Sequence, residues 1–330
     1  MATTKRQVAL IARFQWMLQV RLFRARVQEF ISQHPELDLT IEIPDPEQGV
    51  TEKVMRGLAQ GRREADILDL HTNFEVPLAA KGTMREVFLD LTDLVAGIKG
   101  QLVGWEPCTW HGRIYGLPGL LSGSAYYYRP DVFSELGIDP TTFETWDDFI
   151  RAGLEVKKAK GAYMLALDTS GYNQFQPLAL HAGGGWFDAA GHPRLDCDAN
   201  IRALELYRDL LLKHQIAMPA AKFYGPDTWQ AYRDGTLVGA YMPEWYGANE
   251  MRNNLPEMAG TFRITLAPAF DTGGPRSGYR GGMCASVVRG PNEDVAFEFV
   301  KYVRLNKESL IAAFQENFLS QVWDCRRCLL

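Results

Sequence analysis

The residues of this chain that could do chemistry are aromatic side chains next to planar polar ones. Glu244 precedes Trp245 after an apolar run that ends in Pro243, and Asn173 precedes Gln174. A sugar ring presents apolar C–H faces and a rim of hydroxyls, so its site needs flat aromatic platforms together with amide, carboxylate or guanidinium groups. These pairs therefore indicate binding of a sugar-like molecule. Further aromatic residues fall at predicted loops and strand ends: Phe14, Trp16, Trp105, Trp110, Tyr126 to Tyr128, Trp186, Trp229 and Tyr246.

The competing interpretation is that most of these aromatic side chains belong to a hydrophobic core. We expect a core position for Trp146 and for at least two of the three residues Tyr126 to Tyr128. For Trp245, which follows an apolar strand, a binding role and a core role both stay open.

The common catalytic and metal-binding motifs do not occur in the sequence. There is no GxSxG, GxxxxGK[ST] or HExxH pattern, and no GxGxxG follows a predicted strand. The six histidines never fall at ligand spacing on one helix face. The segment from Asp196 to Asn200 begins like an EF-hand loop, but Ile201 stands where glycine is needed, so a helix start is expected instead. Cys325 and Cys328 form an isolated CxxC to which no function is assigned. We therefore expect no enzymatic activity, no metal and no cofactor.

The composition is that of a soluble protein with two domains. The chain has 330 residues, of which 46% are hydrophobic and 23% charged. A net charge of −5 without a long basic run argues against nucleic acid as a partner. The apolar residues after Lys5 are interpreted as a first strand rather than a signal peptide, because Arg13 interrupts them. The five scattered cysteines argue against a disulfide framework.

The order of the predicted elements indicates two α/β units. The first third alternates strands at 8–14, 39–43 and 66–70 with helices at 20–32 and 50–60, the last closed by Gly61, which implies a mostly parallel sheet covered on both faces. In the middle, Thr145 and Asp148 form a capping box for a helix that Gly161 ends. Strands are expected there at 125–128, 163–167, 237–242 and 262–266, and helices at 201–214 and 228–233.

Six segments in this order resemble the extracellular solute-binding proteins of bacterial carbohydrate ABC importers, the family 1 proteins that include maltose-binding protein. The similarity runs along nearly the whole chain, and it lies in the order of the segments rather than in any single motif. The segments are RLFRARVQEFISQHPELDLTIEI, ADILDLHTNFEVPLAAKGTMREV, WHGRIYGLPGLLSGSAYYYRPDVFSELGIDPTTFETWDDF, LHAGGGWFD, YRDGTLVGAYMPEW and GGMCASVVRGPNEDVAFEFVKYV.

The resemblance implies a two-lobed α/β fold of the periplasmic-binding-protein type II, with lobes that are discontinuous in sequence and joined by a hinge. Residues 1–121 with 273–320 would form the first lobe, residues 122–272 the second, and residues 321–330 an irregular tail. The segment Gly281 to Val288 and a helix at 292–304 would be the return to the first lobe. Because family members add helices after this point, we expect the second lobe to lack its C-terminal helices.

The resemblance also places the ligand in a cleft between the lobes, at the carboxyl ends of strands. In the loop at the return, Arg280 would be a forked hydrogen-bond donor, and the two glycines after it would let backbone N–H groups approach the ligand. The ligand contacts carried over position by position are Gln15, Trp16, His71, Asn73, Ser122, Asn173, Gln174, Glu244, Trp245, Tyr279, Arg280, Gly281 and Gly282.

The implied function is that of a substrate-binding receptor. It would capture a sugar or oligosaccharide and deliver it, as a monomer, to the membrane permease subunits of an ABC importer. Its place would be the periplasm or the cell exterior, tethered to the membrane, although no signal peptide is visible. One alternative is a receptor for a polyamine, a glycerol phosphodiester or a peptide, which a facing acid or clustered arginines would indicate. Another is an enzyme on a similar two-lobed fold, but we find only scattered carboxylates such as Glu244 and Asp69 rather than a cleft pair.

Overall fold

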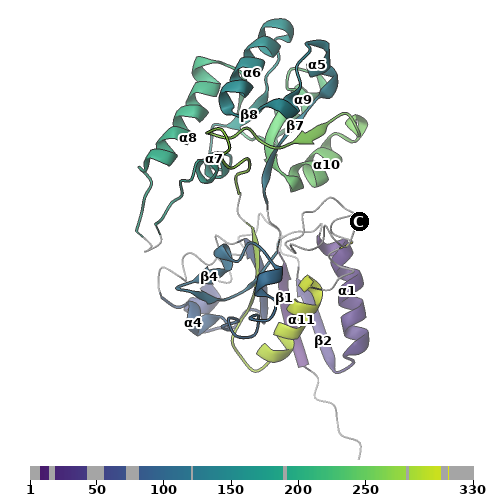
Figure 1. Cartoon of the computed structure of the whole chain (residues 1–330). Helices are drawn as coiled ribbons and strands as arrows, with labels where there is room; N and C mark the ends of the chain where they lie inside the picture. The colour runs from purple at the N-terminus through teal and green to yellow at the C-terminus, as the bar shows by residue number, and fades with distance from the viewer. Residues whose placement is uncertain are drawn as a thin grey trace, which may run out of the picture. The chain divides into compact units, whose positions relative to one another are not determined.

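The computed structural model describes residues 8–14, 19–42, 56–71, 82–119, 122–188, 192–279, 282–305 and 311. The chain divides into two compact units (Figure 1). Unit 1 consists of Met1–Leu121 together with Gly281–Leu330, and unit 2 consists of Ser122–Arg280. No helix in the described ranges is both long and apolar enough to cross a membrane.

Unit 1 is built around a five-stranded sheet with the strand order β2-β1-β3-β12-β6. The first three of these strands pair in parallel, as the strand–helix alternation predicts, whereas β12 runs antiparallel to both of its neighbours. The late segment of the chain therefore enters the interior of the sheet. The strands are β1 (Val8–Phe14), β2 (Leu37–Glu42), β3 (Ile67–His71), β6 (Leu117–Pro118) and β12 (Met283–Val287).

Two helices from opposite ends of the sequence, α1 (Gln19–Gln33) and α11 (Glu293–Leu305), lie side by side (Figure 1). Phe30 of α1 meets Phe299 of α11 edge to face, with ring centroids 5.2 Å apart. Both helices match their predicted positions, because apolar residues recur along each with the helical period and bury one face. Of the predicted helix at 50–60, the described residues 56–59 are helical, and Gly61 follows with a φ of +66°.

Successive side chains of β3 point to opposite faces of the sheet and pack into two different cores of unit 1. Ile67 packs with α1 and α11, whereas Leu68 packs with Met84, Phe88 and Tyr115 on the other face. The shorter elements around these cores are α4 (Met84–Val87), η3 (Lys99–Gln101), η4 (Glu106–Cys108), β4 (Thr109–Trp110) and β5 (Arg113–Ile114).

A buried ion pair joins β3 to α11 inside unit 1. Asp69 is fully buried and accepts from the Arg304 guanidinium, which is itself largely buried. Burial raises the pKa of Asp69, against the opposing effect of the Arg304 charge. Within the described ranges, Oδ1 of Asp69 and Nε of Arg304 have no further hydrogen-bond partner. Among the described residues, Asp69 and Arg304 are therefore each other's ion-pair partner.

The strands of unit 2 share one edge at which the site residues gather. β7 pairs antiparallel with β10 and β11, and β8 pairs in parallel with β9. An isolated parallel bridge between Tyr163 and Leu237, just before β8 and β10, sets these two strands side by side. β8, β9 and β10 therefore end at the same edge, where β7 begins. The strands are β7 (Ser124–Tyr128), β8 (Leu165–Asp168), β9 (Ala217–Ala220), β10 (Gly239–Pro243) and β11 (Arg263–Thr265).

The three consecutive tyrosines of β7 are all buried, which confirms their expected core role. Tyr126 and Tyr128 pack on the face covered by α6, α7 and α8, and Tyr127 packs on the face covered by α9 and η7. The helical segments of unit 2 are α5 (Pro130–Glu135), η5 (Pro140–Thr142), α6 (Trp146–Lys160), α7 (Phe175–His181), α8 (Asp198–Arg208), η6 (Asp209–Lys213), α9 (Pro226–Arg233), η7 (Tyr246–Met251), α10 (Arg252–Asn254) and η8 (Pro256–Met258).

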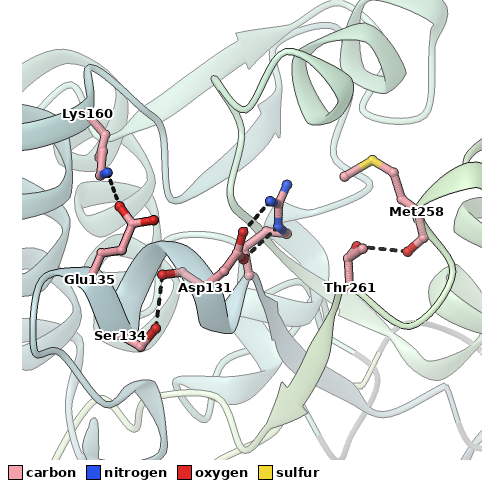
Figure 2. A network of polar contacts seen from close by, with 7 residues as sticks. Asp131, Ser134, Glu135, Lys160, Met258 and Thr261 are labelled. Atoms are coloured by element: carbon pink, nitrogen blue, oxygen red, sulfur yellow. Dashed lines mark hydrogen bonds and ion pairs between the residues drawn. The ribbon is translucent and has the colours of Figure 1, made fainter.

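Helix α6 begins and ends as its sequence predicts. The Thr145 N–H donates to Asp148 Oδ2 at 2.9 Å, which is half of the expected capping box, and Gly161 ends the helix with a φ of +68°. Trp146 is 5% exposed and belongs to the core, as expected. Near its C-terminal end, Lys160 pairs with Glu135 of α5 (Figure 2).

The second crossing between the units lies later than the sequence analysis expected. The family resemblance predicts residues 273–279 in the first lobe, but they belong to unit 2. The Ser124 N–H donates to the Gly278 carbonyl at 2.7 Å, and His181 Nε2 donates to the Pro275 carbonyl at 2.6 Å. Because this Gly- and Pro-rich segment has no hydrophobic period, its sequence does not reveal which unit it packs on.

Candidate functional site

The candidate site lies at the edge of unit 2 where β8, β9 and β10 end. Open α/β sheets place ligand-binding loops at the carboxyl ends of their strands, where the polar groups of the loops are not engaged in hydrogen bonds between strands. The loops at this edge are residues 169–174 after β8, residues 221–225 after β9 and the segment from Glu244 after β10. Ser122, just before β7, lies at the same edge.

Asp168 at the end of β8 organises the first loop. Its Oδ1 accepts from the backbone N–H of Ser170 at 2.8 Å and from the Ser170 hydroxyl at 2.9 Å. Its Oδ2 accepts from the side-chain amide of Asn173 at 3.3 Å, and its carbonyl accepts from the Tyr207 hydroxyl at 2.6 Å. A carboxylate that folds the loop back on itself in this way fixes where Asn173 and its neighbours stand.

Gln174 supports this loop from the inside. It is 3% exposed, its Oε1 accepts from the Asp168 N–H at 2.6 Å, and its Nε2 donates to the Ala166 carbonyl at 2.8 Å. Nε2 also lies 3.6 Å from the sulfur of Met242 on β10. The polar atoms of Gln174 are thus committed to the protein, and its role is to hold the loop after β8 against β10.

Glu244 directly follows β10 and reaches the start of β7. Its Oε1 accepts from the backbone N–H of Ser122 at 3.2 Å. Its Oε2 is buried and has no hydrogen-bond partner among the residues that the structure describes. Burial raises the pKa of Glu244 to about 7, against smaller opposing effects of hydrogen bonds from its own backbone and from Ser122.

Trp245 is half-buried and packs by one side on the core around α9 and η7. Its ring stands edge to face with that of Tyr246, with centroids 6.3 Å apart and planes at 75°. The same core contains Trp229 and Tyr246, which are 5% and 1% exposed. Trp245 therefore differs from these two, because part of its surface remains available at the edge.

Ser122 and Tyr279 stand at the two ends of unit 2. Ser122 is 5% exposed and adopts a φ of +52°, in the left-handed region that costs a non-glycine residue about 1–2 kcal/mol. Gly123 and Tyr279 form an isolated antiparallel bridge. Tyr279 is half-buried, so the predicted contacts Ser122 and Tyr279 come close to each other through this pairing.

The remaining predicted contacts lie in unit 1 or outside the described residues. The backbone of His71 ends β3, and it pairs with Met283, the residue after the buried Gly282. His71 and Gly282 therefore lie at the same end of the paired strands β3 and β12. Gln15, Trp16, Asn73, Arg280 and Gly281 lie outside the described residues.

Two residues at the edge of unit 2, Asp168 and Tyr172, are not among the contacts predicted from the sequence. Tyr172 is 55% exposed in the loop after β8, and its ring meets Trp186 edge to face at 6.4 Å and 84°. The signal was the run Asp-Thr-Ser-Gly-Tyr directly after a buried strand, which combines turn residues with an aromatic one. Conversely, the sequence predicts Trp105 at a loop or strand end, but the residue is 8% exposed, and its indole N–H donates to the Lys99 carbonyl at 3.0 Å.

A family model for bacterial extracellular solute-binding proteins matches residues 19–308, which is most of the chain. This chain belongs to that family. The family assignment agrees with the resemblance drawn from the six sequence segments.

Two relatives of this solute-binding protein are named as arabinooligosaccharide-binding proteins. That of Halalkalibacterium halodurans is 31% identical over 201 residues, which are 60% of this chain and 45% of the relative. That of Bacillus subtilis is 24% identical over 304 residues, covering 88% of this chain and 68% of the relative. The chain thus spans less than half the length of the first of these relatives.

The fold of this solute-binding protein is that of two-lobed periplasmic binding proteins. The sugar-binding protein MalE from Xanthomonas citri superimposes with a TM-score of 0.81 at 15% identity, covering 97% of this chain and 81% of the other. The predicted α/β fold of this type is therefore confirmed.

Proposed function

We propose that this chain is the sugar-binding receptor of an ABC importer, and that it binds an oligosaccharide without changing it chemically. The observation that carries the proposal is the edge of unit 2, in a chain of the solute-binding family. There Trp245 and Tyr172 offer aromatic surface, and Asn173 and Glu244 offer polar groups. This is the combination of flat apolar and planar polar groups that a sugar ring requires.

The relatives support the choice of sugar. Two of them are named for arabinooligosaccharides, so short arabinose oligomers are the first ligands that we propose. We further propose that Ser122 and Tyr279 in unit 2, and Gln15, Trp16, His71, Asn73, Arg280, Gly281 and Gly282, contribute to binding. Gln174 contributes indirectly, by holding the loop of Asn173.

The receptor would act as a monomer outside the cytoplasm, in the periplasm or tethered to the outer side of the membrane. Its partners would be the permease subunits of the importer, to which it delivers the sugar. An enzymatic role has less support, because among the described residues Glu244 is the one carboxyl at this edge with a buried oxygen that lacks a partner, and glycoside hydrolysis needs two carboxyl groups.

The test is a thermal-shift screen against arabinobiose, arabinotriose, lactose and maltotriose. A sugar present at 100 times its Kd adds about 2.7 kcal/mol to the free energy of unfolding, which is a readily measured shift. We expect a shift with at least one sugar, weakened by Trp245→Ala and by Tyr172→Ala. The matched control is Leu212→Ala, at a position of unit 2 that is 71% exposed on η6, away from this edge. No shift with any sugar, or equal shifts in all variants, would overturn the proposal.

A further inference from the structure

The carboxyl of Glu244 has an unusual set of contacts for a buried acid. Its donors are the Ser122 N–H, which donates to Oε1, and the Glu244 backbone, whereas Oε2 is enclosed by protein without a partner in the described ranges. A buried carboxylate normally collects two or three donors or a cation. Neither protonation state of Glu244 therefore has a full set of hydrogen bonds. The ionised form lacks a donor at Oε2, and the neutral form lacks an acceptor for its O–H.

The described groups on the adjoining elements do not supply the missing hydrogen-bond partner of Oε2. On β7, the Tyr127 hydroxyl donates to the main-chain carbonyls of Pro243 at 3.0 Å and Glu244 at 3.2 Å, so it is occupied by the backbone. On η7, Glu250 is a second acid, and burial raises its pKa as well. No described cation contributes to the Glu244 pKa, whose rise to about 7 has burial as its main cause.

The backbone that carries Glu244 cannot easily move the carboxyl elsewhere. The Gly247 N–H lies 3.4 Å from the Tyr127 hydroxyl, and a Cβ at Gly247 would stand 2.6 Å from the Tyr127 ring. The segment from Pro243 to Gly247 is therefore held closely against β7. The unpaired oxygen is buried just behind the edge where we propose that the sugar binds, so a sugar hydroxyl reaches it only when the groups that cover it move aside.

A hydroxyl group is the ligand group that suits this acid. It can donate to the ionised oxygen or accept from the neutral acid, and the bond to the ionised form is the stronger of the two. The strained backbone of Ser122, with its φ of +52°, depends on the same carboxyl, because the Ser122 N–H is its one donor besides the Glu244 backbone.

We propose that Glu244 links sugar binding to pH: a sugar hydroxyl donates to Oε2, binding favours the ionised carboxyl, and the proton held by the free protein is released to solvent. This inference rests on the proposed function. It makes affinity fall as the pH drops below neutrality, because the proton and the sugar hydroxyl compete for the same oxygen. If binding lowers the pKa of the acid by one unit from about 7, Kd rises about fivefold between pH 8 and pH 6.

The experiment is calorimetry with arabinotriose, or the sugar that gives the largest thermal shift, at pH 6, 7 and 8. Each titration is repeated in two buffers of different ionisation enthalpy, which reports the number of protons released. We expect the roughly fivefold loss of affinity in the unmodified protein, with release of about 0.4 proton per sugar at both pH 6 and pH 7 and of less than about 0.1 at pH 8. Glu244→Gln should remove both the pH dependence and the proton release. Glu250→Gln, which removes the half-buried acid of η7, should retain both.

The outcomes separate this inference from the proposed function. Sugar binding with the same Kd at all three pH values, or pH dependence that persists in Glu244→Gln, overturns the proton link and leaves the receptor role intact. If no sugar binds, the receptor role fails, and proton-linked binding fails with it. Carbon-13 NMR of the Glu244 carboxyl in the ligand-free protein then shows whether an acid of pKa near 7 stands at this edge for another purpose.

Discussion

Replacing Gln174 by methionine should destabilise unit 2 and loosen the loop after β8. Methionine keeps nearly the same length and volume, so the change in packing should cost less than about 1.5 kcal/mol. The loss that matters is polar. The Asp168 N–H loses its acceptor at 2.6 Å, and the Ala166 carbonyl loses its donor at 2.8 Å, both in a buried setting. At about 1–3 kcal/mol for each of the two buried groups left unpaired, the free energy of unfolding should fall by roughly 2–6 kcal/mol.

Urea unfolding followed by circular dichroism measures this loss, and hydrogen exchange of the Asp168 amide localises it. The matched control is Gln176→Met, the same change two residues later on α7, where the side chain is only half-buried. We expect the control to change stability by less than about 0.5 kcal/mol. If both variants lose the same free energy, or if the Asp168 amide exchanges no faster in Gln174→Met, then Gln174 does not hold this loop.

Three further predictions concern unit 2. Trp245→Ala should weaken sugar binding by about 1–3 kcal/mol through lost stacking area, while Trp245→Phe retains most of it; unfolding in place of an isolated affinity loss would assign Trp245 to the core. Burial lowers the pKa of His181, so its stabilising contribution should be complete above about pH 6.5 and lost as the pH falls through the lowered value. The difference in unfolding free energy between the unmodified protein and His181→Gln should shrink between pH 8 and pH 5, and an unchanged difference would contradict it; His192→Gln, at an exposed position, should show no such trend. Gly278→Ala should cost about 3 kcal/mol because its Cβ would stand 2.0 Å from a proline carbonyl, whereas Gly97→Ala, with nothing within 4 Å, should be nearly neutral in thermal unfolding.

Most of the fold could be predicted from the sequence because its elements obey simple periods. The first strand, 8–14, has the predicted bounds, and the helix predicted at 20–32 is Gln19–Gln33. Strand β9 was not predicted, because its four residues Ala217–Ala220 include a proline and lack alternation.

The candidate site was harder to predict because one residue type serves two purposes. Trp229 and Trp245 are the same residue type, yet Trp229 is buried in the core, whereas Trp245 keeps part of its surface exposed at the edge of the sheet. Gln174 and Asn173 are adjacent amides, yet the first is enclosed and the second stands half-buried above it. Such differences arise from which element packs on which face, and one sequence does not contain that information.

The placement of β12 in unit 1 has a consequence for the order in which the chain can fold as it is synthesised. β12 lies between β3 and β6, so the sheet lacks an interior strand until the ribosome has made residue 287. Asp69 lacks its counter-charge for longer still, because Arg304 follows 235 residues later. Unit 2 is continuous from Ser122 to Arg280, so it can complete its core while unit 1 still lacks β12 and α11. A fragment that ends at about residue 290 and has been released from the ribosome should therefore carry a protease-resistant unit 2, preceded by an N-terminal segment that remains open to cleavage.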